Sequence, residues 1–248
     1  MTTSTDTAAE PASGQGVEYA RVPHTYYDIV VAVFVGLLLI SGVTATKLFV
    51  GPTVPVISDL FAGGGPLIFD GGAFLFPLSY VVGDIMTEVY GWQRAKRAIW
   101  TGFAMTFLAA ATYKVVGWTT PVEGFEAWDQ VLAPATRIAL AGFAGYLAGN
   151  LLNSLVVVRL KRRFAERQVA FRLITSTLLG ELVDTTLFCT IAFAGTITLA
   201  ELTNYTVTGY FYKVLVEICV VPITLQVIKY LKRVEPTYEM AHGRQVAL

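Results

Sequence analysis

The chain has 248 residues, of which 54% are hydrophobic and only 15% are charged, and its 18 basic and 18 acidic side chains balance. This composition excludes a disordered chain, a disulfide scaffold and an ordinary soluble enzyme, because soluble domains carry about 25% charged residues. Without a basic excess, we expect no nucleic-acid partner. Two histidines and two cysteines, Cys189 and Cys219, are too few for a multi-ligand zinc site. We therefore expect neither a metal nor a cofactor.

Six apolar runs follow a polar N-terminal segment that is rich in Thr, Ser, Ala and Gly and has no signal-peptide core. Each run approaches the length of about 20 residues that crosses a bilayer as a helix. None alternates as a barrel strand would. The sequence therefore predicts an all-α, polytopic membrane protein with six transmembrane helices in residues 26–233, between a disordered tail at 1–25 and a second tail at 234–248. The runs are 27–47, 73–90, 98–116, 138–158, 173–194 and 207–231.

Positive charges gather on one side of the predicted helices. Fourteen of the 18 basic residues lie before run one, between runs two and three, between runs four and five, or at the end of run six. The opposite segments, 48–72, 117–137 and 195–206, contain one basic residue, Arg137, and six acidic residues. Because cytoplasmic loops are rich in Lys and Arg, both termini are predicted to be cytoplasmic. The long, Gly- and Pro-rich segment 48–72 is either a plain connector or a flap over a cavity.

Charged residues inside the runs are the most informative feature of the sequence. An ionised side chain at the bilayer centre costs at least about 2.5–3.5 kcal/mol, so these groups must face one another, a wet cavity or a ligand. Their spacing of three or four residues places each pair on one face of its helix. The pairs are Asp84 and Glu88 in run two, Glu181 and Asp184 in run five, and Lys213 and Glu217 in run six.

Two interpretations of this polar cluster are open. One is a structural network in which Lys213 bridges Glu217 and Asp184. The other, a solute site or proton pathway, is favoured because buried ion pairs contribute little net stability and structural contacts need fewer charges. Lys213 is predicted to be a structural and electrostatic partner of the acids. The predicted substrate-binding residues are the five acids with nearby aromatic and amide groups: Phe76, Tyr80, Asp84, Glu88, Asn150, Glu181, Asp184 and Glu217.

Small residues in run four predict a close helix contact. Gly145 and Gly149 form a small-xxx-small pair, which lets a second helix approach. The pattern is compatible with a partner helix in the same chain or in a second copy, which would make a homodimer.

Motifs of common enzymes are missing from the sequence. His24 and His242 lie outside the apolar runs, and neither a GxxxxGK[ST] phosphate loop nor a GxSxG elbow occurs. We predict that the chain is not an enzyme.

The stretch FPLSYVVGDIMTEVYG at 76–91 resembles the signature of the queuosine precursor transporter family, also called the vitamin uptake transporter family. The stretch STLLGELVDT at 176–185, the sequence YKVL at 212–215 followed by Pro222, and Arg137-Ile138 with Asn150 are similar to the same family. The resemblance covers about residues 26–232. It implies six transmembrane helices in the bacterial cytoplasmic, or inner, membrane. It also implies import of deazapurine precursors of queuosine, the nitrile and aminomethyl forms of 7-deazaguanine.

The predicted acids suit such a substrate. A 7-deazaguanine presents a ring N–H beside an exocyclic amine, and one carboxylate can accept both in charge-assisted hydrogen bonds. The aminomethyl form is also a cation. We therefore predict an importer that binds its substrate with buried carboxylates and aromatic rings. The alternative is the membrane-embedded substrate-binding subunit of an ATP-driven vitamin uptake system, which needs a similar pocket.

Overall fold

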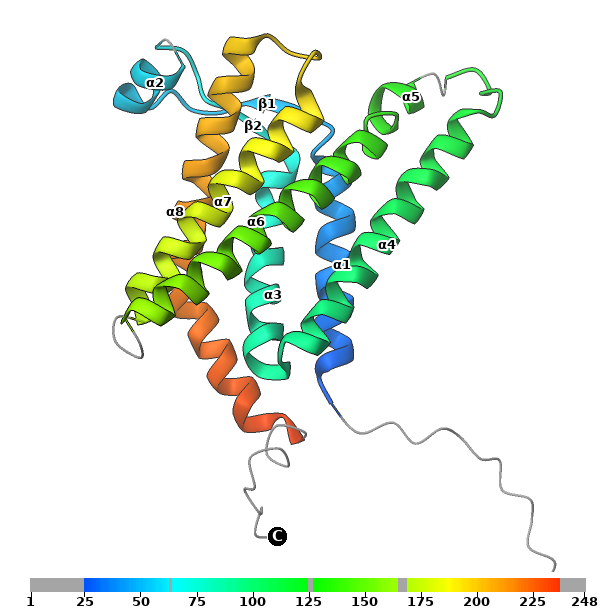
Figure 1. The fold of residues 1–248 in the computed structure, drawn as a ribbon. Helices are drawn as coiled ribbons and strands as arrows, with labels where there is room; N and C mark the ends of the chain where they lie inside the picture. The colour runs from blue at the N-terminus through cyan, green and yellow to red at the C-terminus, as the bar shows by residue number, and fades with distance from the viewer. Residues whose placement is uncertain (1–24, 63, 125–126, 165–168, 237–248) are drawn as a thin grey trace, which may run out of the picture.

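The computed structural model describes residues 25–62, 64–124, 127–164 and 169–236. Of the predicted tails at 1–25 and 234–248, residues 1–24 and 237–248 lie outside these ranges. Long helices that alternate in direction form one elongated bundle (Figure 1). Each predicted apolar run coincides with one of them, which confirms the all-α class. They are α1 (Tyr27–Thr44), α3 (Phe76–Tyr90), α4 (Trp92–Gly117), α6 (Ala135–Phe164), α7 (Val169–Phe193) and α8 (Leu199–Val234).

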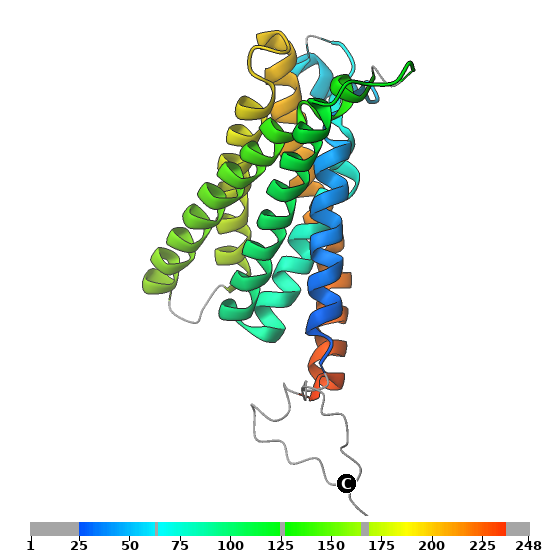
Figure 2. The same cartoon turned by 90° about the vertical axis from the view of Figure 1, so that its right-hand side faces the viewer.

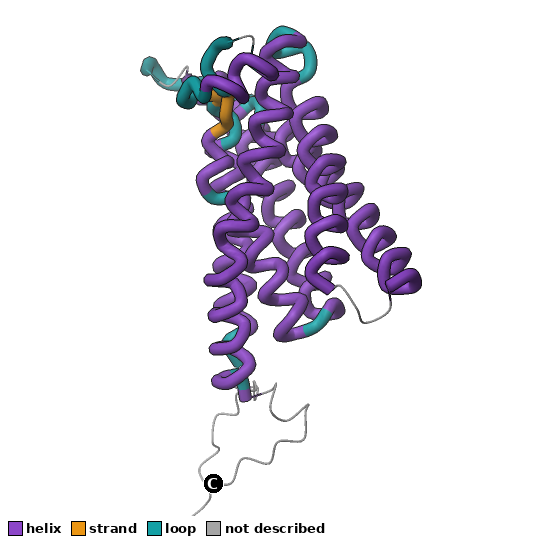
Figure 3. The backbone as a smooth tube through the Cα atoms, turned by 90° about the vertical axis from the view of Figure 1, so that its left-hand side faces the viewer, coloured by secondary structure: helices purple, strands orange, loops and turns teal. Residues whose placement is uncertain are grey.

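Short elements cover one end of the bundle, the upper end in Figure 1. The segment between α1 and α3 contains β1 (Leu48–Val50), α2 (Pro55–Phe61), β2 (Ile68–Asp70) and the 3-10 turn η1 (Gly71–Phe74). The strands pair antiparallel, with Phe49 opposite Phe69, and Figure 3 shows them confined to this end. A further short helix, α5 (Ala127–Leu132), precedes α6.

The hairpin is fixed to α8 by one amide side chain. Asn204 Oδ1 accepts a hydrogen bond from the Ile68 backbone N–H at 3.2 Å, and its Nδ2 donates to the Pro66 carbonyl at 3.0 Å. The Tyr205 hydroxyl donates to the buried Asp70 carboxylate. These contacts satisfy backbone groups that would otherwise be unpaired at the end of the bundle. The described part of segment 48–72 is therefore held against the end of α8 by specific hydrogen bonds.

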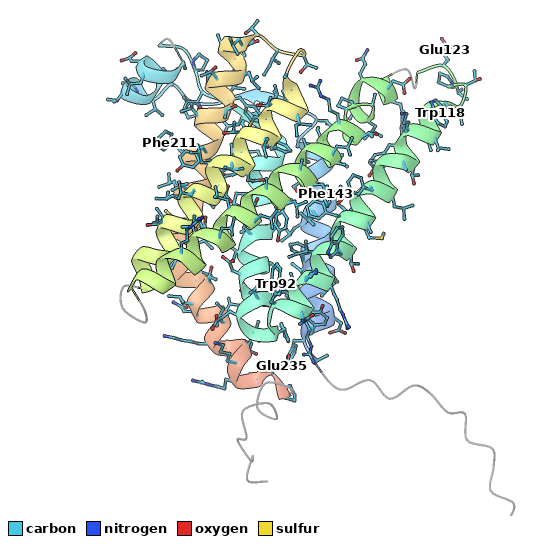
Figure 4. The ribbon with its side chains drawn as sticks, viewed as in Figure 1. Trp92, Trp118, Glu123, Phe143, Phe211 and Glu235 are labelled. Carbon is cyan, nitrogen blue, oxygen red and sulfur yellow. The ribbon has the colours of Figure 1, made fainter. Side chains whose placement is uncertain are left out.

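The opposite end is closed by Glu235, which is fully buried. Its Oε2 accepts hydrogen bonds from the Tyr26 backbone N–H at 3.0 Å and from the Tyr90 hydroxyl at 2.9 Å. These bonds join the start of α1 to the ends of α3 and α8. Both ends of the described chain therefore lie together, and Figure 4 places Glu235 at the end remote from Trp118 and Glu123.

Small residues let the helices approach closely. A Cβ on Gly102 of α4 would lie 2.6 Å from Leu38 Cδ1 of α1, so a larger residue would force the leucine side chain to move. Figure 2 shows α1 and α4 side by side. The outer surface is largely apolar, as expected for helices that face lipid. Examples of exposed large side chains are Ile40, Leu108, Leu151, Ile218 and Leu225.

Length and composition qualify four stretches of the described chain as membrane spans: α1, α4, residues 127–149, and α8. Helix α3 has 15 residues, about 22 Å, and carries two acids. Helix α7 has 25 residues and holds Glu181 and Asp184 in its middle. Both helices thus carry acids where the predicted site lies.

Candidate functional site

A cavity between five helices occupies the half of the bundle that contains the Trp92 end of α4 (Figure 4). It encloses about 620 Å³, including the part that opens outward. We call it the acidic cavity. Its lining is Tyr80, Gly83, Asp84 and Thr87 of α3, Trp92 and Ile99 of α4, Tyr146 and Gly149 of α6, Thr177, Gly180, Glu181 and Asp184 of α7, and Glu217 of α8.

Four carboxylates line the acidic cavity. Asp84 is exposed to its space and Glu217 is half-buried. Glu181 and Asp184 are buried, with 6% and 2% of their surface exposed. The structure thus brings together four of the five predicted acids, and Tyr80 with them. Spacings of three and four residues along α7 and α3 place these groups on the cavity side of each helix.

Lys213 of α8 reaches the two buried acids from the opposite side. Its Nζ lies 2.8 Å from Asp184 Oδ2 and 3.5 Å from Glu181 Oε2. The Tyr80 hydroxyl donates to the same Asp184 oxygen at 2.6 Å. The ammonium also lies 4.7 Å from the centre of the Phe76 ring, within the range of cation–π attraction. Asp184 is therefore the centre of a cluster that ties α3, α7 and α8.

The charges of this site do not balance. Four carboxylates line the acidic cavity, Lys213 pairs with Asp184 and Glu181, and no basic residue is found among the described residues that line this cavity. Asp184 Oδ1 is buried and has no hydrogen-bond donor within the described chain, and the buried Glu181 Oε2 has only the Lys213 ammonium at 3.5 Å. Buried acceptors without donors are costly. The arrangement is chemically suited to a ligand that brings N–H donors or a positive charge.

Glycines of α6 allow Asp184 to occupy its position. A Cβ on Gly145 would lie 2.6 Å from Asp184 Oδ1 and 2.8 Å from its backbone oxygen. A Cβ on Gly149 would lie 2.9 Å from Asp184 Cβ and from the Gly180 carbonyl oxygen. The small-xxx-small pair predicted from the sequence is thus used inside the chain, against α7.

We expect Gly145→Ala to destabilise the protein by about 1–3 kcal/mol, as overpacking of a close contact does. The backbone oxygen of Asp184 cannot rotate away, so α6 and α7 must separate. Thermal unfolding in detergent measures the effect. Gly142→Ala on the same helix is the matched control, because a Cβ there would meet no neighbouring element within 4 Å. Equal melting temperatures for the two variants would contradict this account of the contact.

Two predicted site residues lie away from the acidic cavity, and the side chain of a third is not described. Glu88 lies at the exposed surface and pairs with Lys232. Phe76 lines a second cavity, on the other side of Lys213. Asn150 belongs to α6, and its side chain lies outside the described part of the chain. Their roles in binding stay predictions.

Sequence reasoning missed two interactions that hold the site's helices. Arg137 at the start of α6 donates to the carbonyl oxygens of Ile191 and Ala194, both at 2.5 Å. It therefore neutralises the negative end of α7. Arg137 is the one basic residue in segments that otherwise carry acidic residues, and this pattern in the sequence could have identified it. Tyr146, whose ring centre lies 5.8 Å from that of Tyr80, adds an aromatic wall to the acidic cavity. It directly follows Gly145, the first residue of the glycine pair.

Comparison with known proteins places the chain among transporters. Residues 70–227 match the family described as "Putative vitamin uptake transporter". A "Probable queuosine precursor transporter" of Haemophilus influenzae is 29% identical over 122 residues, which are 49% of this chain and 51% of the relative. A "Queuosine precursor transporter" of Escherichia coli is 30% identical over 122 residues, 49% of this chain and 54% of the relative. The chain thus matches about half the length of these curated relatives. No solved structure matches.

The family match extends from β2 to the lower part of α8 and includes every residue that lines the acidic cavity. Both relatives are bacterial and are named as transporters, not as enzymes. The chain belongs to the vitamin uptake transporter family, as a multi-pass protein of the bacterial cell membrane.

Proposed function

We propose that this chain imports queuosine precursors, the nitrile and aminomethyl forms of 7-deazaguanine, and binds them in the acidic cavity. The observation that carries the proposal is the set of four carboxylates in one cavity, of which Asp184 and Glu181 pair with Lys213. The names of the two relatives support the same substrate class.

The chemistry of the ligand fits the lining. The ring N–H and exocyclic amine of a deazaguanine can both donate to one carboxylate, and Asp84 is the acid most accessible from the cavity. A second acid can then accept the charged aminomethyl group. Tyr80, Tyr146 and Trp92 offer faces for a flat ring. A purine without the two adjacent donors would leave buried acceptors unpaired.

Uptake by the purified chain in liposomes tests this function. We expect labelled aminomethyl-7-deazaguanine to accumulate or equilibrate across the membrane, and unlabelled nitrile form to compete with it, whereas adenine should not compete. Empty liposomes are the control. Absence of uptake of both deazaguanines by folded protein would contradict the proposal. Uptake that appears only after ATPase subunits are supplied would instead support a subunit of an ATP-driven system, which the relatives' names do not favour.

The proposed transporter crosses the membrane six times and has cytoplasmic termini. The six long helices alternate in direction, and Glu235 joins the start of α1 to the end of α8. An even number of crossings follows if each helix spans the bilayer. The basic residues near this end favour its cytoplasmic placement. In this arrangement residues 26–233 form the transport domain.

Labelling of single cysteines tests the topology. In a Cys219→Ala background, we expect Glu123→Cys to react with an impermeant thiol reagent added to intact cells. Gln93→Cys should react only after the membrane is permeabilised. Both positions are exposed, lie at opposite ends of the bundle and leave every basic residue in place. The reverse pattern would overturn the orientation, and equal reaction of both in intact cells would overturn the six-span arrangement.

A further inference from the structure

A second cavity of about 740 Å³ lies in the half of the bundle that the hairpin covers. We call it the aromatic cavity. Phe76, Phe103, Phe188, Tyr205 and Tyr212 contribute rings to its lining, and Lys213 and Asp70 contribute its charged groups. Thr185 Oγ also faces this region; it is 1% exposed and has no hydrogen-bond partner within the described chain. The cavity therefore combines flat apolar walls with an unused polar group.

Along each of three helices, the lining changes from the aromatic cavity to the acidic cavity at the same level. On α3, Phe76 lines the aromatic cavity and Tyr80, one turn later, lines the acidic cavity. On α7, the division falls between Asp184 and Thr185. On α8, Lys213 lines the aromatic cavity and Glu217, one turn later, the acidic one. One layer of side chains thus separates the cavities.

That layer is the cluster already described. Asp184 lies on the acidic side and Lys213 on the aromatic side, and their charged groups meet at 2.8 Å. The Tyr80 hydroxyl completes the layer on the same Asp184 oxygen. These interactions join side chains of three helices, so they can separate when the helices move. They are charge-assisted hydrogen bonds, which a ligand with competing donors can replace.

We propose that the aromatic cavity is a second binding site for the same flat heteroaromatic substrate, and that the layer of Tyr80, Asp184 and Lys213 is the barrier between the two sites. This inference rests on the proposed transport function. Substrate from the hairpin side stacks on the rings of the aromatic cavity beside Lys213. Its N–H donors then replace Lys213 and Tyr80 on Asp184, and the substrate passes to the acidic cavity. The barrier closes when Lys213 returns to Asp184.

Two matched cysteines test the barrier without any substrate. Thr106 of α4 lines the aromatic cavity and Thr87 of α3 lines the acidic one. Each hydroxyl donates only to the carbonyl four residues earlier in its own helix, so Thr→Cys is mild at both positions. In a Cys219→Ala parent, a small cationic, impermeant methanethiosulfonate is applied to right-side-out and to inverted vesicles. Labelling of the parent, through Cys189, is subtracted.

We expect Thr106→Cys to react in right-side-out vesicles and Thr87→Cys in inverted vesicles. Adding Tyr80→Phe removes one hydrogen bond to a charged group. It should raise the rate of Thr87→Cys labelling in right-side-out vesicles about tenfold or more. The pair Lys213→Met with Asp184→Asn, which removes both charges of the shortest ion pair in the layer, should do the same. Ala98→Cys, in the buried core, reports general loosening and should stay unlabelled.

Reaction of both cysteines from the same side would overturn the two-sided arrangement. Unchanged Thr87→Cys labelling in both barrier variants would overturn the role of the layer, as would equal gains at Ala98→Cys. Protection of Thr106→Cys from labelling by aminomethyl-7-deazaguanine tests the second binding site. If the substrate is transported but does not slow this labelling, the proposal of a second site is wrong. The labelling pattern does not depend on which solute is carried. A failure of the proposed function would appear as absent uptake with normal labelling.

Discussion

Asp84→Asn should weaken substrate binding about 5- to 150-fold, as expected when a buried polar pairing worth about 1–3 kcal/mol is lost. Asp84 is exposed to the acidic cavity, so the substitution changes the ligand's surroundings more than the protein's packing. Asparagine keeps the shape of the side chain but replaces one acceptor by a donor. The folded yield and melting temperature should therefore stay near those of the parent protein.

Asp184→Asn should have a second effect as well. Asp184 is 2% exposed and receives hydrogen bonds from Lys213 and Tyr80, so the substitution weakens the contact of three helices and leaves Lys213 with Glu181. We expect lower affinity together with a lower melting temperature. Binding of labelled deazaguanine and thermal unfolding are measured on the same purified samples.

Glu88→Gln supplies the comparison on α3. Glu88 lies one turn after Asp84 but at the exposed surface, beside Lys232. If binding follows the geometry of the cavity, the affinity of Glu88→Gln for substrate should change less than twofold. Exposed ion pairs contribute about 0–1 kcal/mol, and this pair lies away from the proposed ligand. Transport at the parent rate by normally expressed Asp84→Asn and Asp184→Asn would disprove a carboxylate site.

The helices were predictable from the sequence because their apolar lengths fit a bilayer. The residues at which the helices begin and end were not predictable in the same way. Helix α8 begins at Leu199, eight residues before the predicted run at 207–231, because Thr198 and Glu201 form a capping box that hydropathy does not detect. The hairpin of β1 and β2 was also missed. It has three residues in each strand, and its stability depends on Asn204 of a distant helix.

The candidate site was predictable in its residue types but not in its pairing. Helical periodicity indicates that Asp84 and Glu88 share a face, but not how that face is rotated at each end of α3. The chain places Asp84 in the cavity and Glu88 beside Lys232. Similarly, spacing on α8 suggested that Lys213 bridges Glu217 and Asp184. The structure confirms Asp184 as a partner, but the second close acid is Glu181, also on α7, because Gly145 and Gly149 let that helix approach α6 closely.

Lys213→Ala should destabilise the protein by about 3–5 kcal/mol, the cost of leaving a buried charge without its partner. Asp184 and Glu181 are 2% and 6% exposed, so an unpaired charge on either acid would regain little of its hydration. The first consequence should be a lower yield of folded protein in the membrane. A change in substrate choice should come after that loss and not before it.

The identity of the rescuing substitution follows from the distances. Asp184 Oδ2 lies 2.8 Å from the ammonium and Glu181 Oε2 lies 3.5 Å from it, so Asp184→Asn should restore more of the lost stability than Glu181→Gln. Glu217→Gln should restore less than either, because Glu217 faces the acidic cavity and Lys213 the aromatic one. Unfolding of the single and double variants gives the coupling energies directly.

The same measurements distinguish a structural lysine from one that holds the ligand. If Lys213 is a structural partner, Lys213→Ala should have a lower melting temperature than the parent. The double variant Lys213→Ala with Asp184→Asn should have a higher melting temperature than Lys213→Ala alone. If Lys213 mainly contacts a ring nitrogen or carbonyl of the substrate, Lys213→Ala should melt at the normal temperature and fail to bind substrate. That second result would assign Lys213 to the binding site, and it would also remove the ion pair as the energetic basis of the barrier between the two cavities.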